Sequence, residues 1–208
     1  MKIINLAKNN SIINYYLTQL RDKDMQHDRL RFKTNIVRIG TILAYEASKY
    51  IDYGNKSIET PFMKTNSCEL INHPILYCIV RAGITMIQGA EKIFDNSNIA
   101  YFVGTHVHTI KHVNFVKSSN VNNKVLIIAD PITTTGDTIK LAIESIRQYG
   151  IPSKVIILSI IATPMSIENL SKLLSDDSIL ITCSIDNFSK MYKGTRPGIG
   201  DIGDLLFG

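Results

Sequence analysis

Residues 125–138 organise the rest of this chain. They read Val125-Leu126-Ile127-Ile128-Ala129-Asp130-Pro131-Ile132-Thr133-Thr134-Thr135-Gly136-Asp137-Thr138. The five apolar residues at 125–129 are typical of a buried strand, and apolar residues at helical spacing follow directly after a hydroxyl-rich turn. A strand, turn and helix of this kind bring exposed backbone N–H groups and the positive end of the helix to one spot. We therefore predict a phosphate-binding turn here.

The side chains of this turn strengthen the prediction. Three threonines add hydroxyl donors, namely Thr134, Thr135 and Thr138. Gly136 lets a ligand approach the backbone closely, and Asp130 at the tip of the strand suits sugar hydroxyls. The Gly-Lys-Ser or Gly-Lys-Thr of the P-loop is absent from the sequence, which disfavours ATP cleavage by that route. The alternative is an ordinary helix start that Thr135 or Asp137 caps.

Short apolar runs and helical patterns alternate on both sides of this segment. The predicted strands are 75–80, 99–104, 125–129, 155–161 and 178–183, and the predicted connecting helices are 84–94, 137–149 and 166–174. Two amphipathic helices are predicted ahead of them, at 11–20 and 30–50. The alternation predicts an α/β fold in which helices cover both faces of a parallel sheet. With 208 residues and no internal repeat or linker, the chain is expected to form a single domain, residues 1–208.

Composition limits the classes of partner. The 23 Lys and Arg residues exceed the 18 Asp and Glu residues by five, but they form no basic stripe, so a nucleic-acid partner is not expected. No apolar run is long enough to cross a membrane, and residues 1–9 lack the apolar core of a secretion signal. The three cysteines have no metal-binding spacing. These features predict a soluble cytoplasmic protein.

A second turn offers groups suited to an anion. Arg81 follows the predicted strand 75–80 and precedes Ala82 and Gly83. A guanidinium group and bare backbone N–H groups would thus lie together at the carboxyl end of a strand, where pyrophosphate is a natural guest. The alternative is that Arg81 pairs with a surface carboxylate, which is the usual fate of an isolated arginine.

The residues of four segments resemble the uracil phosphoribosyltransferase family. The motif at 125–138 resembles the family's phosphoribosyl pyrophosphate motif, and Arg81-Ala82-Gly83 resembles its Arg-Ala-Gly turn. Pro197-Gly198-Ile199-Gly200-Asp201-Ile202-Gly203-Asp204 resembles its terminal uracil loop. Leu20-Arg21-Asp22-Lys23-Asp24 and Ala44-Tyr45-Glu46 are similar to its opening helices, so the resemblance covers nearly the whole chain in order.

The resemblance implies a function and a set of site residues. It implies transfer of ribose 5-phosphate from phosphoribosyl pyrophosphate to uracil, which gives UMP and pyrophosphate, with a hood of amino-terminal helices and carboxyl-terminal loop over the sheet. The implied catalytic residues are Arg81, Asp130 and Asp201. The implied phosphoribosyl pyrophosphate ligands are Arg81, Ala82, Gly83, Asp130, Thr133, Thr134, Thr135, Gly136, Asp137 and Thr138. The implied uracil ligands are Pro197, Gly198, Ile199, Gly200 and Asp201.

The resemblance also implies a metal and an assembly. A hydrated magnesium ion is expected near Asp201, because this hard cation bridges phosphates and a carboxylate. A homodimer or larger homo-oligomer is expected, and the apolar faces of the amino-terminal helices could supply the contact. In the terminal loop, small residues let main-chain groups bind the edge of a flat base. The alternative there is a glycine-rich tail without a fixed shape, and the segment 193–208 is predicted to contain no regular element.

The segment 105–115 departs from the family. It lacks the arginine and the acidic residues that family members carry there, and it contains His106, His108 and His112 instead. These histidines are either solvated loop residues or an imitation of a metal site. Lys193-Gly194-Thr195-Arg196 is a further departure, because the family tends to have a tyrosine and branched apolar residues beside the base. The alternative function is therefore a weakly active or non-catalytic regulator that binds nucleotide or phosphoribosyl pyrophosphate.

Overall fold

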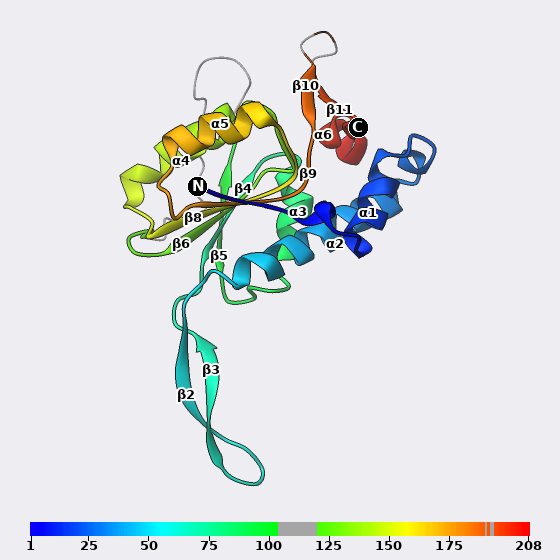
Figure 1. Ribbon diagram of the computed structural model, residues 1–208. Coiled ribbons are helices and arrows are strands. Elements are labelled where there is room, and N and C mark those ends of the chain that lie inside the picture. The colour runs from blue at the N-terminus through cyan, green and yellow to red at the C-terminus, as the bar shows by residue number, and fades with distance from the viewer. Residues whose placement is uncertain (104–119, 190, 192–193) are drawn as a thin grey trace.

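The structure is a computed structural model that describes residues 1–103, 120–189, 191 and 194–208. His106, His108, His112 and Lys193 lie outside these ranges, so the expectations for them are not tested. The elements in Figure 1 alternate between strands and helices around one central sheet. Across the described ranges, no helix has the length and apolar character that a membrane span requires.

The central sheet is parallel throughout. Its strands are β1 (Lys2–Asn5), β4 (Ile75–Ile79), β5 (Asn98–Phe102), β6 (Val125–Ala129), β7 (Ile132–Thr133), β8 (Lys154–Ala162) and β9 (Ile179–Ile185). Their order is β1-β9-β8-β6-β4-β5, and the short β7 pairs with β8. Ala129 at the end of β6 lies opposite Cys78 of β4 and Leu158 of β8. The carboxyl ends of β4 and β6 are therefore neighbours at one edge of the sheet.

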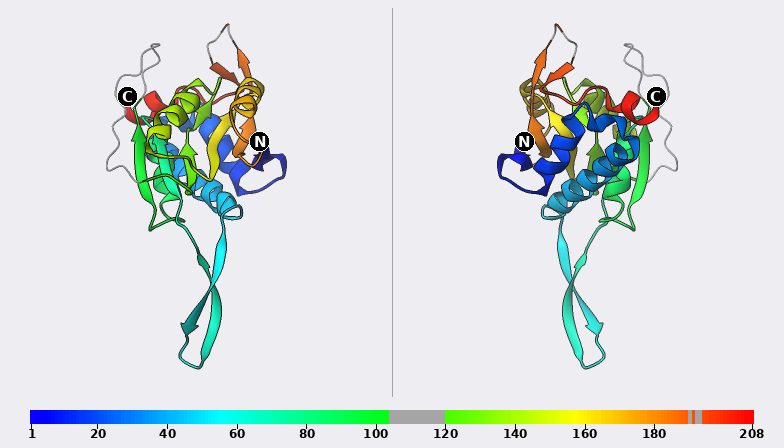
Figure 2. Two further views of the ribbon diagram at one scale, coloured as in Figure 1. Left: turned by 90° about the vertical axis from the view of Figure 1, so that its left-hand side faces the viewer. Right: turned by 90° about the vertical axis from the view of Figure 1, so that its right-hand side faces the viewer.

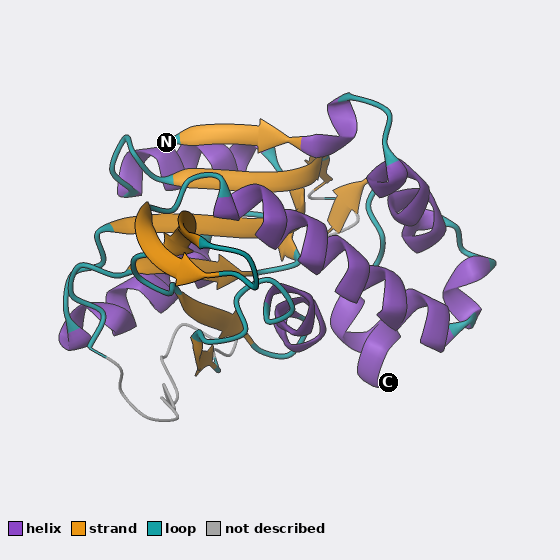
Figure 3. Cartoon of the chain, turned by 90° about the horizontal axis from the view of Figure 1, so that it is seen from below, coloured by secondary structure: helices purple, strands orange, loops and turns teal. Residues whose placement is uncertain are grey.

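Helices cover both faces of this sheet, as Figures 1 and 3 show. On one face the buried residues of α1 (Ile12–Arg21), α2 (Arg29–Ser48) and α3 (Gly83–Ala90) pack against the strands. On the other face α4 (Asp137–Ile146) and α5 (Pro164–Leu173) do so. The strands β4 and β6 are buried at every position because both of their faces are covered. The predicted α/β fold with a parallel sheet is confirmed.

Capping residues in the sequence determine where helices α1 and α5 begin. Ser11 and Asn14 form a reciprocal capping box at the start of α1, and Thr163 and Ser166 form another at the start of α5. Pro164 occupies the first turn of α5, where its missing N–H costs nothing. Three short 3₁₀ turns also occur, at Leu6–Lys8, Met25–His27 and Arg147–Tyr149.

The sequence patterns did not predict strands β1, β2 (Tyr53–Glu59) and β3 (Lys64–Leu70). The hairpin of β2 and β3 projects from the body in Figure 2, and almost all of its residues are exposed. Because neither face of the hairpin is covered, its sequence shows no apolar alternation. The four-residue strand β1 lies at the edge of the sheet and is too short for a clear pattern.

The prediction that 193–208 contains no regular element is wrong. In that segment β11 (Gly194–Arg196) pairs with β10 (Asn187–Ser189), and α6 (Ile202–Phe207) follows. Asp201 caps α6, because its side chain accepts a hydrogen bond from the backbone N–H of Asp204 at 3.1 Å. Ile202 is buried against the core that α1 and α2 share, so the tail and the amino-terminal helices form the expected hood.

Candidate active site

Asp130 lies directly after β6, at the carboxyl edge of the sheet. Its backbone N–H donates to the carbonyl of Leu158 at 3.0 Å, and its Oδ2 accepts a hydrogen bond from Thr133 at 3.3 Å. Burial raises the pKa of Asp130 to about 7, against a smaller opposing effect of the Thr133 hydrogen bond. A carboxyl group with so few donors around it suits a site whose remaining hydrogen bonds come from a ligand.

The turn between Asp130 and α4 is partly buried, since Thr133 and Gly136 are buried and Thr134 and Thr135 are half-buried. Gly136 is the N-cap residue of α4, with a φ of 83°, and no side chain caps the helix there. The ordinary cap by Thr135 or Asp137 is therefore not formed at the N-cap position. The Thr135 hydroxyl instead accepts from the Asp137 N–H at 3.3 Å and donates to the Asp137 carboxylate at 2.7 Å. The positive end of α4 thus faces the turn.

Side chains from α5 and from its N-cap residue Thr163 hold the backbone of this turn in place. The hydroxyl of Thr163 donates to the carbonyl of Thr134, and the amide of Asn169 donates to the carbonyl of Thr135 at 3.0 Å. Since these carbonyls are tied back towards α5, the opposite N–H side of the turn is left for a ligand. Lys140 and Asn169 border a pocket beside Thr135. Sequence reasoning missed these two residues, because they lie within ordinary amphipathic helices.

The Arg81 turn lies beside the same strand end. Arg81 follows β4, and a Cβ atom placed on Gly83 would lie 2.7 Å from the carbonyl oxygen of Ala129. The turn therefore packs directly on the residue that precedes Asp130. Arg81 donates to the Asp204 carboxylate at 2.9 Å, in a pair whose side chains are 56% and 65% exposed. The surface pairing considered from the sequence is thus present, but it is an exposed pair of low strength.

The segment Pro197-Gly198-Ile199-Gly200-Asp201, here called the base loop, has a defined conformation. Its Gly198 N–H donates to Asp186 at 2.8 Å, and its Ile199 carbonyl accepts from Gln26 at 2.7 Å. Gly198 has a φ of 68°, and a Cβ atom there would lie 2.2 Å from the carbonyl oxygen of Thr195, so only glycine fits. The base loop is therefore not a shapeless tail.

The predicted site residues come from three segments, and glycines lie where these segments meet. Gly203 lies between the base loop and the Arg81 turn, because a Cβ atom on it would be 3.1 Å from Asp201 Oδ1 and 3.3 Å from Arg81 Nη2. Gly83 joins the Arg81 turn to the end of β6, as described above. Nowhere in the ranges that the structure covers do three His, Cys, Asp or Glu side chains form a cluster that could hold a metal ion.

Comparison with known proteins gives the family. The sequence model of the uracil phosphoribosyltransferase family matches residues 7–208. The chain is 30% identical to the uracil phosphoribosyltransferase of Porphyromonas gingivalis, over 100% of this chain and 99% of that protein. It is 32% identical to the enzyme of the same name from Mycoplasma genitalium, over 92% of this chain and 93% of that one.

A solved structure of another protein has the same fold. The AQ2163 protein of Aquifex aeolicus superposes with a TM-score of 0.86 at 23% identity, covering 99% of this chain and 97% of that one. The match to the family model extends over nearly the whole sequence, and it includes the turn at 130–138, the Arg81 turn and the base loop. This chain therefore belongs to the uracil phosphoribosyltransferase family.

Proposed function

We propose that this protein transfers ribose 5-phosphate from phosphoribosyl pyrophosphate to uracil, which yields UMP and pyrophosphate. The observation that carries the proposal is the meeting of the Arg81 turn with the end of β6 and with the tail, in a chain of this family. The reaction requires a cradle for the 5-phosphate, a site for the leaving pyrophosphate and a surface for the base. Each of the three segments has the chemistry that one of these subsites requires.

The turn Thr133-Thr134-Thr135-Gly136-Asp137-Thr138 is the proposed cradle for the 5-phosphate. Its backbone N–H groups face away from the carbonyls that α5 holds, and the positive end of α4 points into it. Holding the phosphate still fixes the position of the anomeric carbon, which lowers the entropic cost of the reaction.

Arg81, Ala82 and Gly83 are the proposed pyrophosphate site. The guanidinium of Arg81 would exchange the carboxylate of Asp204 for the more highly charged pyrophosphate. That exchange costs little, because an exposed ion pair contributes only about 0–1 kcal/mol. By taking up negative charge on the departing group, Arg81 lowers the barrier to breaking the bond between the anomeric carbon and oxygen.

Asp130 is the proposed partner of the ribose. During the reaction the sugar becomes positively charged, and a carboxylate beside it stabilises that charge. A cation or sugar hydroxyls at Asp130 would favour its ionised form, which burial disfavours in the protein alone. The ring nitrogen of uracil then forms a bond to the anomeric carbon as the bond to pyrophosphate breaks, and the proton of that nitrogen passes to the departing pyrophosphate or to water. No covalent enzyme intermediate is needed.

The base loop is the proposed uracil site, and Asp201 the proposed contact to hydrated magnesium. Magnesium is commonly bound by one or two carboxylates together with substrate phosphates. Asp201 fits this pattern, because its carboxylate lies across Gly203 from Arg81, on the side where pyrophosphate is proposed. When bound, magnesium neutralises part of the negative charge on pyrophosphate. The main-chain groups of Gly198, Ile199 and Gly200 would bind the edge of the base.

We also propose a homodimer or larger assembly in the cytoplasm. The tip of the β2–β3 hairpin carries Phe62 and Met63, which are 96% and 65% exposed, and Leu30 at the start of α2 is 76% exposed. Large apolar side chains that are exposed in this way favour contact with a second copy of the chain. The three cysteines are all free, which suits a reducing compartment. Sedimentation as a monomer at working concentration would contradict the assembly.

The function is tested by incubating the purified protein with labelled uracil, phosphoribosyl pyrophosphate and magnesium, and by separating the products by charge. We expect labelled UMP and an equal amount of pyrophosphate. Parallel reactions with orotate and with hypoxanthine serve as controls and should give far less product. Binding of phosphoribosyl pyrophosphate without any UMP would instead support the non-catalytic regulator.

A further inference from the structure

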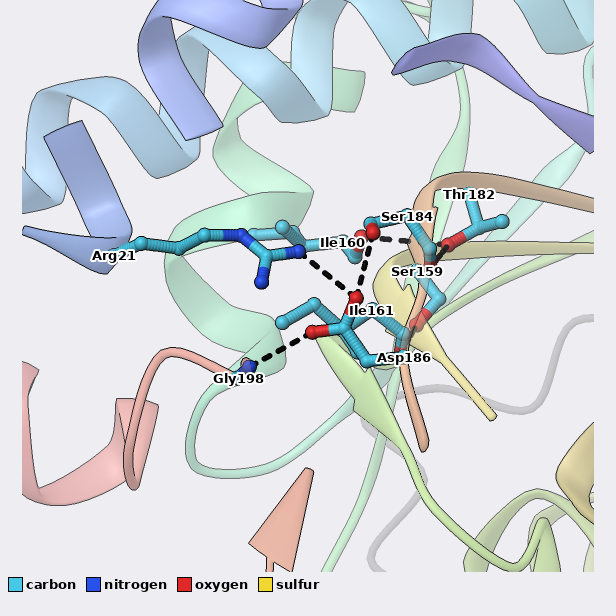
Figure 4. A network of polar contacts seen from close by, with 8 residues as sticks. All are labelled: Arg21, Ser159, Ile160, Ile161, Thr182, Ser184, Asp186 and Gly198. Atoms are coloured by element: carbon cyan, nitrogen blue, oxygen red, sulfur yellow. Dashed lines mark hydrogen bonds and ion pairs between the residues drawn. The ribbon is translucent and has the colours of Figure 1, made fainter. Parts of the chain in front are cut away.

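A buried carboxylate connects the base loop to the amino-terminal helices. Asp186 follows β9 directly, and its side chain is only 2% exposed. Its Oδ1 accepts hydrogen bonds from Arg21 at 2.9 Å and from the Ser184 hydroxyl at 2.6 Å, and its Oδ2 accepts from the Gly198 N–H at 2.8 Å. Figure 4 shows the carboxylate between the guanidinium of Arg21 and the backbone of Gly198.

The pair of Arg21 and Asp186 is charged despite its burial. Burial by itself raises the pKa of Asp186, but the hydrogen bonds from Arg21, Ser184 and the Gly198 amide together hold it below the ordinary value. The Arg21 side chain is 19% exposed. Removing one member of such a pair leaves an uncompensated buried charge, so separating Arg21 from Asp186 is costly. It can therefore fix the position of the Gly198 amide.

A second contact runs parallel to this pair. Gln26, in the 3₁₀ turn after α1, donates from its side-chain amide to the carbonyl of Leu20 and to the carbonyl of Ile199, both at 2.7 Å. Arg21 is the last residue of α1, so both contacts start from the same end of that helix. The base loop is thus held at two successive residues, at Ile199 directly by Gln26 and at Gly198 by Asp186, which Arg21 contacts.

We propose that Arg21, Gln26 and Asp186 form a latch that positions the base loop for uracil, and that affinity for the base depends on this latch. The proposal rests on the proposed function, because it takes the base loop as the uracil site. These are positioning residues, which act through the main chain of Gly198 and Ile199. Arg21 Nη1 is buried and has no hydrogen-bond partner among the residues that the structure describes, so the latch keeps a donor for a group that arrives at the loop.

The test compares Michaelis constants for the two substrates. In Arg21→Met we expect KM for uracil to rise roughly 10-fold, while KM for phosphoribosyl pyrophosphate changes less than about 2-fold. Arg21→Lys, which keeps the charge, should recover part of the loss. Arg31→Met is the matched control, because Arg31 forms an exposed ion pair with Asp28 and should leave both constants unchanged.

A second readout does not require activity. Hydrogen exchange of the Gly198 amide should be slow in the parent and at least about 10-fold faster in Arg21→Met, because its acceptor is no longer held. If Arg21→Met does not fold, the double variant Arg21→Met with Asp186→Asn removes both charges and should give the same results. Equal changes in both KM values, or unchanged exchange at Gly198 in a folded variant, would overturn the latch. A parent without UMP formation refutes the proposed function, whereas exchange at Gly198 still tests the latch.

Discussion

The turn at 130–138 and the base loop are the proposed sites for the two substrates, and they are stabilised differently. The turn is held by Thr163 and Asn169, which belong to the next helical segment of the chain, and by the start of its own helix α4. The base loop is held by Gln26, from the opposite end of the chain, and by Asp186, which in turn pairs with Arg21. Damage to the turn should therefore affect the phosphoribosyl substrate, and damage to the distant contacts should affect the base.

The largest expected effect is at Asp130. Asp130→Asn should lower the rate of UMP formation by about 100-fold or more, because it removes the charge that stabilises the positive sugar. Folding should be preserved, since among the residues that the structure describes only Thr133 donates a side-chain hydrogen bond to this carboxyl group. Single-turnover kinetics with saturating substrates measure the effect. A rate within a few-fold of the parent would exclude Asp130 from the chemistry.

The same substitution should stabilise the protein at alkaline pH. Because the pKa of Asp130 is raised to about 7, the folded state binds more protons than the unfolded state between about pH 4 and pH 7, so the parent loses stability as pH rises through that window. Asn cannot ionise, and Asp130→Asn should exceed the parent by about 1–3 kcal/mol in free energy of unfolding at pH 8. Urea titrations at pH 5 and pH 8 check this. An equal difference at the two pH values would contradict the raised pKa.

The segment around Asp130 could be predicted from the sequence because its parts are adjacent in the chain. The strand, the acid and the hydroxyl-rich turn are contiguous, so the pattern at 125–138 predicted the strand, the turn and the helix that follows it. The strands β4 and β6 were predictable for the same reason, because burial on both faces produces unbroken apolar runs. The roles assigned to the individual site residues remain predictions.

Other features depend on contacts that no local pattern encodes. Asp186 and Gln26 are ordinary polar residues in the sequence, and only the approach of the tail to α1 gives them their partners. The β2–β3 hairpin was missed because both of its faces are exposed, and α6 was missed because its glycine-rich surroundings resemble a loop. Arg81 was predicted from its place at a strand end, but its partner Asp204 was not.

A moderate effect is expected within the turn. Thr135→Val removes a hydroxyl donor from the proposed phosphate cradle and should raise KM for phosphoribosyl pyrophosphate about 5-fold, which corresponds to one hydrogen bond. KM for uracil should stay within about 2-fold. Thr34→Val on α2 is the matched control, since its hydroxyl bonds only the carbonyl of Leu30. A change in KM for uracil alone would reverse the assignment of the two regions.

The smallest effect is expected at Lys172. It pairs with Glu168 on the surface of α5, and the two side chains are 70% and 67% exposed. Lys172→Gln should change the free energy of unfolding by less than about 0.5 kcal/mol, because water screens such a pair. Both KM values should match the parent. A loss comparable with that of Thr135→Val would extend the phosphate site along α5, beyond the turn.

The most direct test of this division of the site is calorimetric titration with ribose 5-phosphate and with UMP, which share the phosphate and differ by the base. The parent, Thr135→Val and Arg21→Met are compared. We predict that Thr135→Val weakens the binding of both ligands, whereas Arg21→Met weakens the binding of UMP alone. Equal losses for both ligands in Arg21→Met, or unchanged binding of both in Thr135→Val, would contradict the account.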